Sequence, residues 1–202
     1  MAIKLLREHD RIINRVLYGV IALKFDTYVE AGREIGVPEN VLISAVKDGR
    51  IPFKKNRYKI LNYYGIPEEI LFNKEDIEKR KAVALKNNGI IDRNFYDYEY
   101  PIKGAPFVEY GCIGVKKPRF RVPTKGMVRR PVLYAVLIAE NITVSEFASF
   151  IGISGRNGRS YIYDTVYPKT HRISIIENLL NFSIEHLFYE VDDFDVKNFE
   201  ED

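Results

Sequence analysis

The chain has 202 residues, a formal net charge of +3, 46% hydrophobic residues and a single cysteine. This length and apolar content suffice for one sizeable domain or for two small ones, each with its own core. Apolar runs fall far short of the ~20 residues of a membrane-spanning helix, and the start lacks the apolar core of a signal peptide. We therefore expect a cytoplasmic protein without a membrane partner. Cys112 cannot form an intrachain disulfide, and three scattered histidines indicate neither a metal site nor another cofactor.

The sequence matches itself without gaps at an offset of 116 residues. Sixteen identities fall over 57 aligned positions, where residues 16–72 are superposed on residues 132–188. Chance rarely aligns capping residues, glycine and proline in one register, so the match predicts two homologous units. The expected division is 1–72 and 131–189 for the two units, 73–130 for a connecting segment and 190–202 for an acidic tail.

The predicted helices follow one another in the same order in both units. Apolar residues at helical spacing predict first helices near residues 12–23 and 132–137. Thr27 with Glu30, and Thr143 with Glu146, match the T-x-x-E capping box and predict the starts of second helices. Gly36 and Gly152 then suit a turn. Third helices are expected at 38–47 in the first unit and 154–163 in the second. Fourth helices are expected at 55–64 and 172–181, and short closing segments follow at 69–72 and 185–188.

These elements carry a family resemblance. The strings "TYVEAGREIGVPENVLISAVKDGRIP...GIPEEILF" and "TVSEFASFIGISGRNGRSYIYDTVYP...NFSIEHLF" resemble the Cro and CI repressor (XRE-like) helix-turn-helix family. The resemblance implies a mainly α fold with two lambda-repressor-like helix-turn-helix domains, each of five helices, whose third helix enters the DNA major groove. Tyr28 and Val144 depart from the family pattern, which usually has a phosphate-contacting glutamine there. The segment from Gly36 to Gly49 is one residue longer than usual.

Major-groove reading requires side chains that donate or accept hydrogen bonds near the start of the third helix. The candidate base contacts are Arg156, Asn157, Arg159, Ser160 and Tyr163 in the second unit and Asn40, Ser44 and Lys47 in the first. Glu39 would repel phosphate unless it accepts from a cytosine amino group. Candidate phosphate contacts are Thr27 and Thr143 at helix starts, Lys54, Lys55, Arg57, Lys169 and Arg172 after the third helices, and Lys116, Lys117, Arg119, Arg121 and Lys125 between the units.

Positive charge is concentrated in the connecting segment. Residues 73–130 carry about +7 and residues 190–202 about −6. Residues 73–86 are compatible with a helix, whereas the short runs at 87–130, broken by glycine and proline, predict a small β-hairpin or extended arm. The run from Lys116 to Arg130 contains no acidic residue and suits phosphates or a minor groove; the alternative is an exposed connector. We expect the acidic tail to be disordered or to compete with DNA for the basic segment.

The residues form no constellation typical of catalysis, so we do not expect an enzyme or a small-molecule substrate. The glycines from Gly152 to Gly158 lack the lysine of a phosphate-binding loop. The favoured function is sequence-specific double-stranded DNA binding by a phage or mobile-element regulator or accessory protein, with two units forming an intrachain pseudo-dimer. Whether the chain also forms a homodimer is left open. The alternative is a protein-interaction module with a helix-turn-helix fold, such as a phage inhibitor of a host enzyme.

Overall fold

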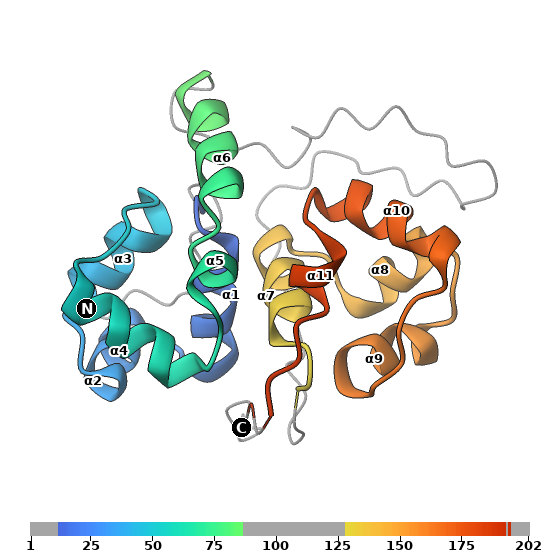
Figure 1. The fold of residues 1–202 in the computed structure, drawn as a ribbon, viewed down its shortest axis with the longest axis horizontal. Coiled ribbons are helices and arrows are strands. Elements are labelled where there is room, and N and C mark those ends of the chain that lie inside the picture. The colour runs from blue at the N-terminus through green and yellow to red at the C-terminus, as the bar shows by residue number, and fades with distance from the viewer. Residues whose placement is uncertain (1–11, 87–127, 193, 195–202) are drawn as a thin grey trace.

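The computed structural model describes residues 12–86, 128–192 and 194, and these residues form a mainly α fold, as predicted (Figure 1). The N-terminal half contains α1 (Arg15–Lys24), α2 (Tyr28–Ile35), α3 (Glu39–Lys47), α4 (Lys54–Tyr64), α5 (Glu68–Leu71) and α6 (Lys74–Lys86). The C-terminal half contains α7 (Pro131–Glu140), α8 (Val144–Phe150), α9 (Gly155–Tyr163), α10 (Thr170–Leu180) and α11 (Ile184–Leu187). The predicted hairpin or arm and most of the acidic tail lie outside the described residues.

The helix boundaries repeat at the offset found in the sequence. α1, α3, α4 and α5 begin and end 116 residues before α7, α9, α10 and α11, and α2 begins 116 residues before α8. After each second helix the chain turns at a glycine in the left-handed region, with φ of 73° at Gly36 and 68° at Gly152. The N–H of the next residue, Val37 or Ile153, donates at 2.8 Å to a carbonyl of that helix. The two halves therefore share their local geometry as well as their helix order.

Of the two predicted capping boxes, at the starts of α2 and α8, only the second is complete. The Thr27 hydroxyl accepts from the Glu30 N–H at 3.1 Å, and the Thr143 hydroxyl accepts from the Glu146 N–H at 3.2 Å. The Glu146 carboxylate accepts in return from the Thr143 N–H at 2.8 Å, which completes the box in α8. The Glu30 carboxylate accepts instead from the Asp26 N–H at 3.1 Å, one residue too early. The prediction is confirmed in full for α8 and in half for α2.

α1 and α7 lie side by side at the centre of the molecule and join its two halves (Figure 1). Every residue of α1 except the last, and every residue of α7 except the last, is buried. Burial of this kind requires protein on all sides of both helices. The two backbones meet at Gly19 and Ala135, where a Cβ added to Gly19 would lie 2.2 Å from the Ala135 carbonyl oxygen. Because these positions are equivalent at the 116-residue offset, an approximate two-fold axis passes through their contact.

One hydrophobic core crosses from the N-terminal half to the C-terminal half. The same buried cluster contains Leu17, Leu42 and Leu71 from the first half and Leu133 and Leu187 from the second. The hydrophobic effect that stabilises each half thus also favours one fixed arrangement of both halves.

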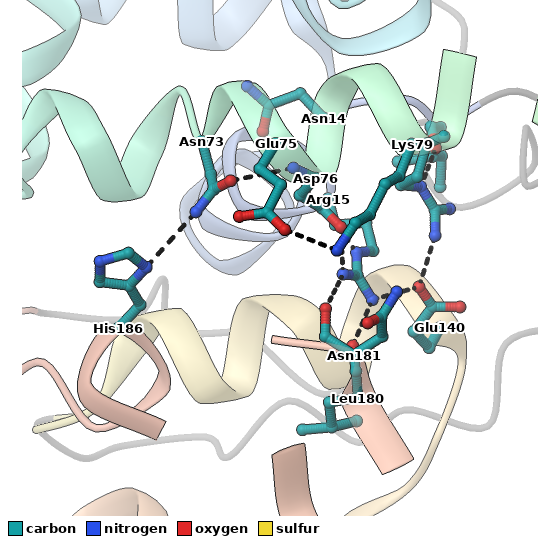
Figure 2. Close-up of polar contacts among 12 residues, drawn as sticks. Asn14, Arg15, Asn73, Glu75, Asp76, Lys79, Glu140, Leu180, Asn181 and His186 are labelled. Carbon is teal, nitrogen blue, oxygen red and sulfur yellow. Dashed lines mark hydrogen bonds and ion pairs between the residues drawn. The ribbon is translucent and has the colours of Figure 1, made fainter. Parts of the chain in front are cut away.

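A buried network of charged side chains closes one end of the α1 and α7 contact (Figure 2). Arg15 is fully buried and donates through two guanidinium nitrogens to Asp76 of α6, at 2.9 Å to Glu140 of α7 and at 2.8 Å to the Leu180 carbonyl. Arg80 of α6 donates at 2.8 Å to the same Glu140 oxygen. Two arginines face two carboxylates, which is the condition under which buried charge is tolerated. The network therefore attaches α6 to both halves.

The described helices give no membrane-spanning element by themselves. Within the described ranges, no single helix is both long enough and apolar enough to cross a membrane. α7 and α8 pass that test only as a pair, by length and composition, and they are bent by 93° relative to each other. The apolar surface of α7 is already buried against the other helices.

We predict that Gly19→Ala destabilises the protein. The added methyl group would meet the Ala135 backbone, which cannot rotate away as a side chain can. Overpacking of this kind costs about 1–3 kcal/mol. Gly155→Ala is the matched control, because its Cβ would meet only the Ser145 hydroxyl at 3.8 Å. That variant should be neutral or gain at most about 1 kcal/mol. Free energies of unfolding from urea titrations compare the two, and equal stability of both variants would contradict the central contact.

We also predict that the stabilising effect of Glu140 depends on pH. Burial raises the pKa of the Glu140 carboxyl. The charges of Arg80 and Arg15 and their hydrogen bonds lower it by more, so that the pKa lies below its usual 4.5. A depressed pKa stabilises the fold above the usual value, and this contribution is lost as the pH falls through the lowered pKa. Glu140→Gln should cost about 3–5 kcal/mol at pH 7, since it removes one of the two carboxylates that balance the buried charges of Arg15 and Arg80.

The stability gap between wild type and Glu140→Gln should therefore narrow in acid. Urea titrations at pH 7 and at several values below 4.5 measure this gap. Glu75→Gln is the control, because Glu75 pairs with Lys79 on the exposed surface of α6 and should show little change in stability. A gap that stays constant with pH would show that the Glu140 charge does not contribute.

Candidate nucleic-acid interface

α9 presents most of its predicted base-contact residues to solvent. Arg156, Asn157 and Arg159 are exposed, whereas Tyr161 and Ile162 of the same helix are buried in the core. Ser154 is the N-cap of this helix, and its hydroxyl accepts from the Asn157 N–H at 3.3 Å. Helical periodicity thus places the long polar side chains outward and the apolar ones inward.

Gly158 lies where α9 packs against α8. A Cβ on Gly158 would lie 2.8 Å from the Ala148 Cβ and 3.2 Å from the Val144 carbonyl oxygen, both in α8. The absence of a side chain therefore lets α8 and α9 approach closely. Gly155, by contrast, faces open space apart from the Ser145 hydroxyl. Of the two glycines in α9, only Gly158 therefore has a packing role.

The last two candidates in α9 are engaged within the protein. The Ser160 hydroxyl donates to the Arg156 carbonyl at 3.3 Å. Tyr163 is half-buried, and its ring lies 6.3 Å from that of Tyr134 in an edge-to-face contact with a hydrogen bond between the hydroxyls. Burial raises the pKa of Tyr163, although the hydrogen bond to Tyr134 and the charge of Arg159 act in the opposite direction. Tyr163 thus links the exposed face of α9 to the central helix α7.

α3 presents a shorter and more mixed set of side chains. Asn40 is exposed, as is Glu39 beside it. Ser44 is half-buried and donates to the Asp48 carboxylate at 3.3 Å. Lys47, the last residue of the helix, is half-buried. The structure thus brings Asn40, Ser44 and Lys47 onto the accessible side of α3. This side has no counterpart of the two exposed arginines of α9.

The structure describes seven of the twelve candidate phosphate contacts, and their surroundings differ. Lys54, Lys55 and Lys169 are exposed at the starts of α4 and α10, and Arg172 is half-buried one turn into α10. Arg57 pairs with Glu68 at 3.1 Å, so its charge is partly neutralised. Thr27 and Thr143 are occupied by their own helix caps, and Glu30 and Glu146 place carboxylates at the same helix starts. Lys116, Lys117, Arg119, Arg121 and Lys125 lie outside the described residues.

Arg130 corrects the interpretation of the basic run between the halves. The sequence places it among surface cations, but its side chain is buried. It donates to the carbonyls of Tyr161 and Val166, pairs with Glu190 at 2.7 Å and lies 4.7 Å from the centre of the Phe188 ring. Its neighbour Arg129, by contrast, is exposed. The guanidinium therefore joins the end of α9 to the C-terminal segment, and it is not available to phosphate.

Sequence reasoning correctly predicted a helix at residues 73–86, which is α6, but it missed the Arg15 network and the helices against which α6 packs. The available signal was Arg15 itself, a charged residue in an otherwise apolar run. Its partners Asp76, Glu140 and Leu180 are 61 to 165 residues away, so no local pattern could name them. Within the described part of the chain, no group of three or more histidine, cysteine, aspartate or glutamate side chains could hold a metal ion.

Comparison with protein-family models, with curated proteins and with solved structures gave no match.

Proposed function

We propose that the protein binds double-stranded DNA in a sequence-specific manner, with α9 and α3 as recognition helices of two helix-turn-helix units. The observation that carries this proposal is the exposed face of α9, where Arg156, Asn157 and Arg159 stand on a helix fixed by Gly158 and Tyr163. The resemblance of the sequence to Cro and CI repressors supports the same function. The proposed biological role is that of a regulator or accessory protein of a phage or mobile element.

The chemistry of α9 fits the edges of base pairs in a major groove. Arginine binds guanine through two hydrogen bonds, and asparagine binds adenine in the same way. Neither Arg156 nor Arg159 forms an ion pair with another described residue, so both guanidinium groups can face a ligand. The nine residues of α9 span about 13 Å, which suits the roughly 12 Å width of the groove.

The two halves are proposed to read unlike half-sites as an intrachain pseudo-dimer. The equivalent positions of Gly19 and Ala135 at the central contact relate α3 to α9 by an approximate two-fold axis. Two-fold dimers of this family place their recognition helices in successive major grooves, about 34 Å apart. Because Asn40 and Ile43 in α3 occupy the positions of Arg156 and Arg159 in α9, the preferred DNA site should not be palindromic.

We predict that Arg156→Ala and Arg159→Ala each weaken binding to the preferred site by about 1–3 kcal/mol, that is roughly 5- to 150-fold. The preferred site is first selected by wild-type protein from a random pool of duplexes. Fluorescence anisotropy then gives the dissociation constant of each variant for this site and for an unrelated duplex. The loss should be larger for the selected site, since these arginines are proposed to read bases.

Two further variants separate base reading from general attraction. Lys54→Ala should weaken binding to both duplexes alike and reduce the salt dependence by about one phosphate contact. Arg33→Ala is the matched control, since Arg33 is exposed on α2 and is not a proposed contact. If Arg156→Ala and Arg159→Ala bind the selected site as tightly as Arg33→Ala does, α9 is not the reading helix.

A protein-interaction module is the second candidate, and one observation favours it. Val166 and Tyr167, which follow α9, are 46% and 50% exposed although both are large and apolar. Exposed apolar side chains near one another are typical of protein contacts. A module of this kind would show no salt-sensitive association with duplex DNA even near 50 mM salt, so the same anisotropy assay separates the two functions.

A further inference from the structure

A groove of about 650 Å³ lies on the N-terminal half, between α3, the chain that leads into α4, and α6. Its lining mixes polar side chains with four apolar ones and one exposed aromatic ring, and it includes Glu78, which pairs with Lys81 at 2.9 Å. The lining side chains central to the argument are Asn40, Arg50, Ile51, Phe53, Asn56 and Lys74. The groove thus contains Asn40, one of the candidate base contacts, together with residues that sequence reasoning did not single out.

Phe53 is the unusual member of this lining. Its side chain is 91% exposed, although full burial of a phenylalanine would stabilise the fold by about 1.5–3 kcal/mol. The equivalent position in the other half is Lys169, so the repeated fold does not require a phenylalanine there. An aromatic ring held at the edge of a groove with its faces accessible is suited to stacking on another flat group.

The charges and polar groups around Phe53 indicate what that flat group is. Arg50 and Lys74 form no ion pair with another described residue and so are available to an anion. Asn40 and Asn56 supply amides that can both donate and accept hydrogen bonds. Stacking aromatics beside cations and amides are how proteins hold unstacked nucleotides.

A peptide partner fits the same lining less well. Helix-in-groove recognition requires a row of apolar pockets for several anchor side chains. Here Ile77 is buried at 3% exposure, and the other large apolar side chain with substantial exposure beside Phe53 is Ile51, at 36%. The apolar surface therefore suffices for one ring and not for a row of anchors.

We propose that this groove holds an unstacked nucleotide of a nucleic-acid chain. Phe53 stacks on the base, Asn40 and Asn56 bond its edge, and Arg50 and Lys74 bind the flanking phosphates. The proposal rests on the proposed DNA binding for its class of ligand. It adds a second mode of contact to duplex reading by α3 and α9: the groove takes a base that has left its stack, and Asn40 then contacts this base instead of a paired one.

A unique fluorescent reporter tests the proposal, because the chain contains no tryptophan. Phe53→Trp places one indole at the groove edge, where a stacked base should quench its fluorescence. The probes are a 20-nucleotide single strand of mixed sequence and the blunt duplex formed with its complement. Tyr58→Trp is the matched control, since Tyr58 lies on α4, is 65% exposed and does not line the groove. The single strand should quench Phe53→Trp and leave Tyr58→Trp nearly unchanged.

Alanine variants give the binding energies. Phe53→Ala should weaken single-strand binding about tenfold, within the range measured for base stacking on aromatic side chains. Arg156→Ala and Arg159→Ala should leave single-strand quenching of Phe53→Trp unchanged, since these arginines are proposed to read duplex. Because Phe53 is exposed, its replacement should not lower the unfolding midpoint, which a urea titration checks.

The outcomes distinguish this inference from the proposed function. Equal responses of Phe53→Trp and Tyr58→Trp, or wild-type single-strand affinity in Phe53→Ala, overturn the nucleotide site even if α9 still reads duplex. A spectral shift with an acidic amphipathic peptide, and none with the oligonucleotide, assigns the groove to a protein and also overturns it. Failure of the protein to bind either form of DNA overturns the proposed function, and this inference with it.

Discussion

The contact between α1 and α7 is the constraint on which the rest of the structure depends. Gly19 and Ala135 bring the two backbones so close that no side chain fits at position 19. The core that surrounds this contact is continuous across both halves. Because the interior is close-packed, a shift of one half against the other would open voids or create overlaps. The separation of α3 and α9 is therefore set at the centre of the molecule, by residues that no ligand touches.

The two ends of this central contact are built differently, although the helices around them repeat. At one end, α6 follows α5 and supplies Asp76 and Arg80 to the buried charge network. At the other end, the Lys24 ammonium lies 4.7 Å from the centre of the Phe194 ring, which in turn stacks on Tyr64. Both arrangements cover the ends of α1 and α7. Only the first places a long helix beside α3, and that helix forms one wall of the groove at Phe53.

This difference gives a physical reason for the two halves to do different work. α9 carries two exposed arginines on a helix whose rear face is fixed by Gly158 and Tyr163. α3 carries Asn40 and lies next to the groove at Phe53. Under the proposed function, a duplicated unit whose copies diverge in this way would recognise two unlike segments of one nucleic acid without a second chain.

Local features of the fold could be predicted from the sequence, because they depend on neighbouring residues. Threonine caps, the turn glycines Gly36 and Gly152 and the helical spacing of apolar residues placed the helices to within a few residues. The exposure of Arg156 and Arg159 followed from the same periodicity. The helix-turn-helix identity of the units and their ligand remain predictions.

Features that depend on distant partners could not be predicted. The apolar sequence of α7 indicates that the helix is buried, but it does not indicate which element covers it. The pairing of α7 with α1 could therefore not be predicted from the hydrophobic pattern. Arg130 looked like part of a surface run because only its distant partners, among them Glu190 and the Val166 carbonyl, reveal its burial. The groove at Phe53 is lined by residues of both α3 and α6, and nothing local to either helix indicates that the two line one groove.

The distance between α3 and α9 in solution tests the central claim most directly. Spin labels are attached at the equivalent exposed positions through Asn40→Cys and Arg156→Cys, in a background where the single native cysteine is changed by Cys112→Ser. Pulsed electron paramagnetic resonance then measures the distribution of label distances. A close-packed core shared by both halves requires one narrow distribution. A broad or two-peaked distribution would show that the halves move independently and would contradict the central claim.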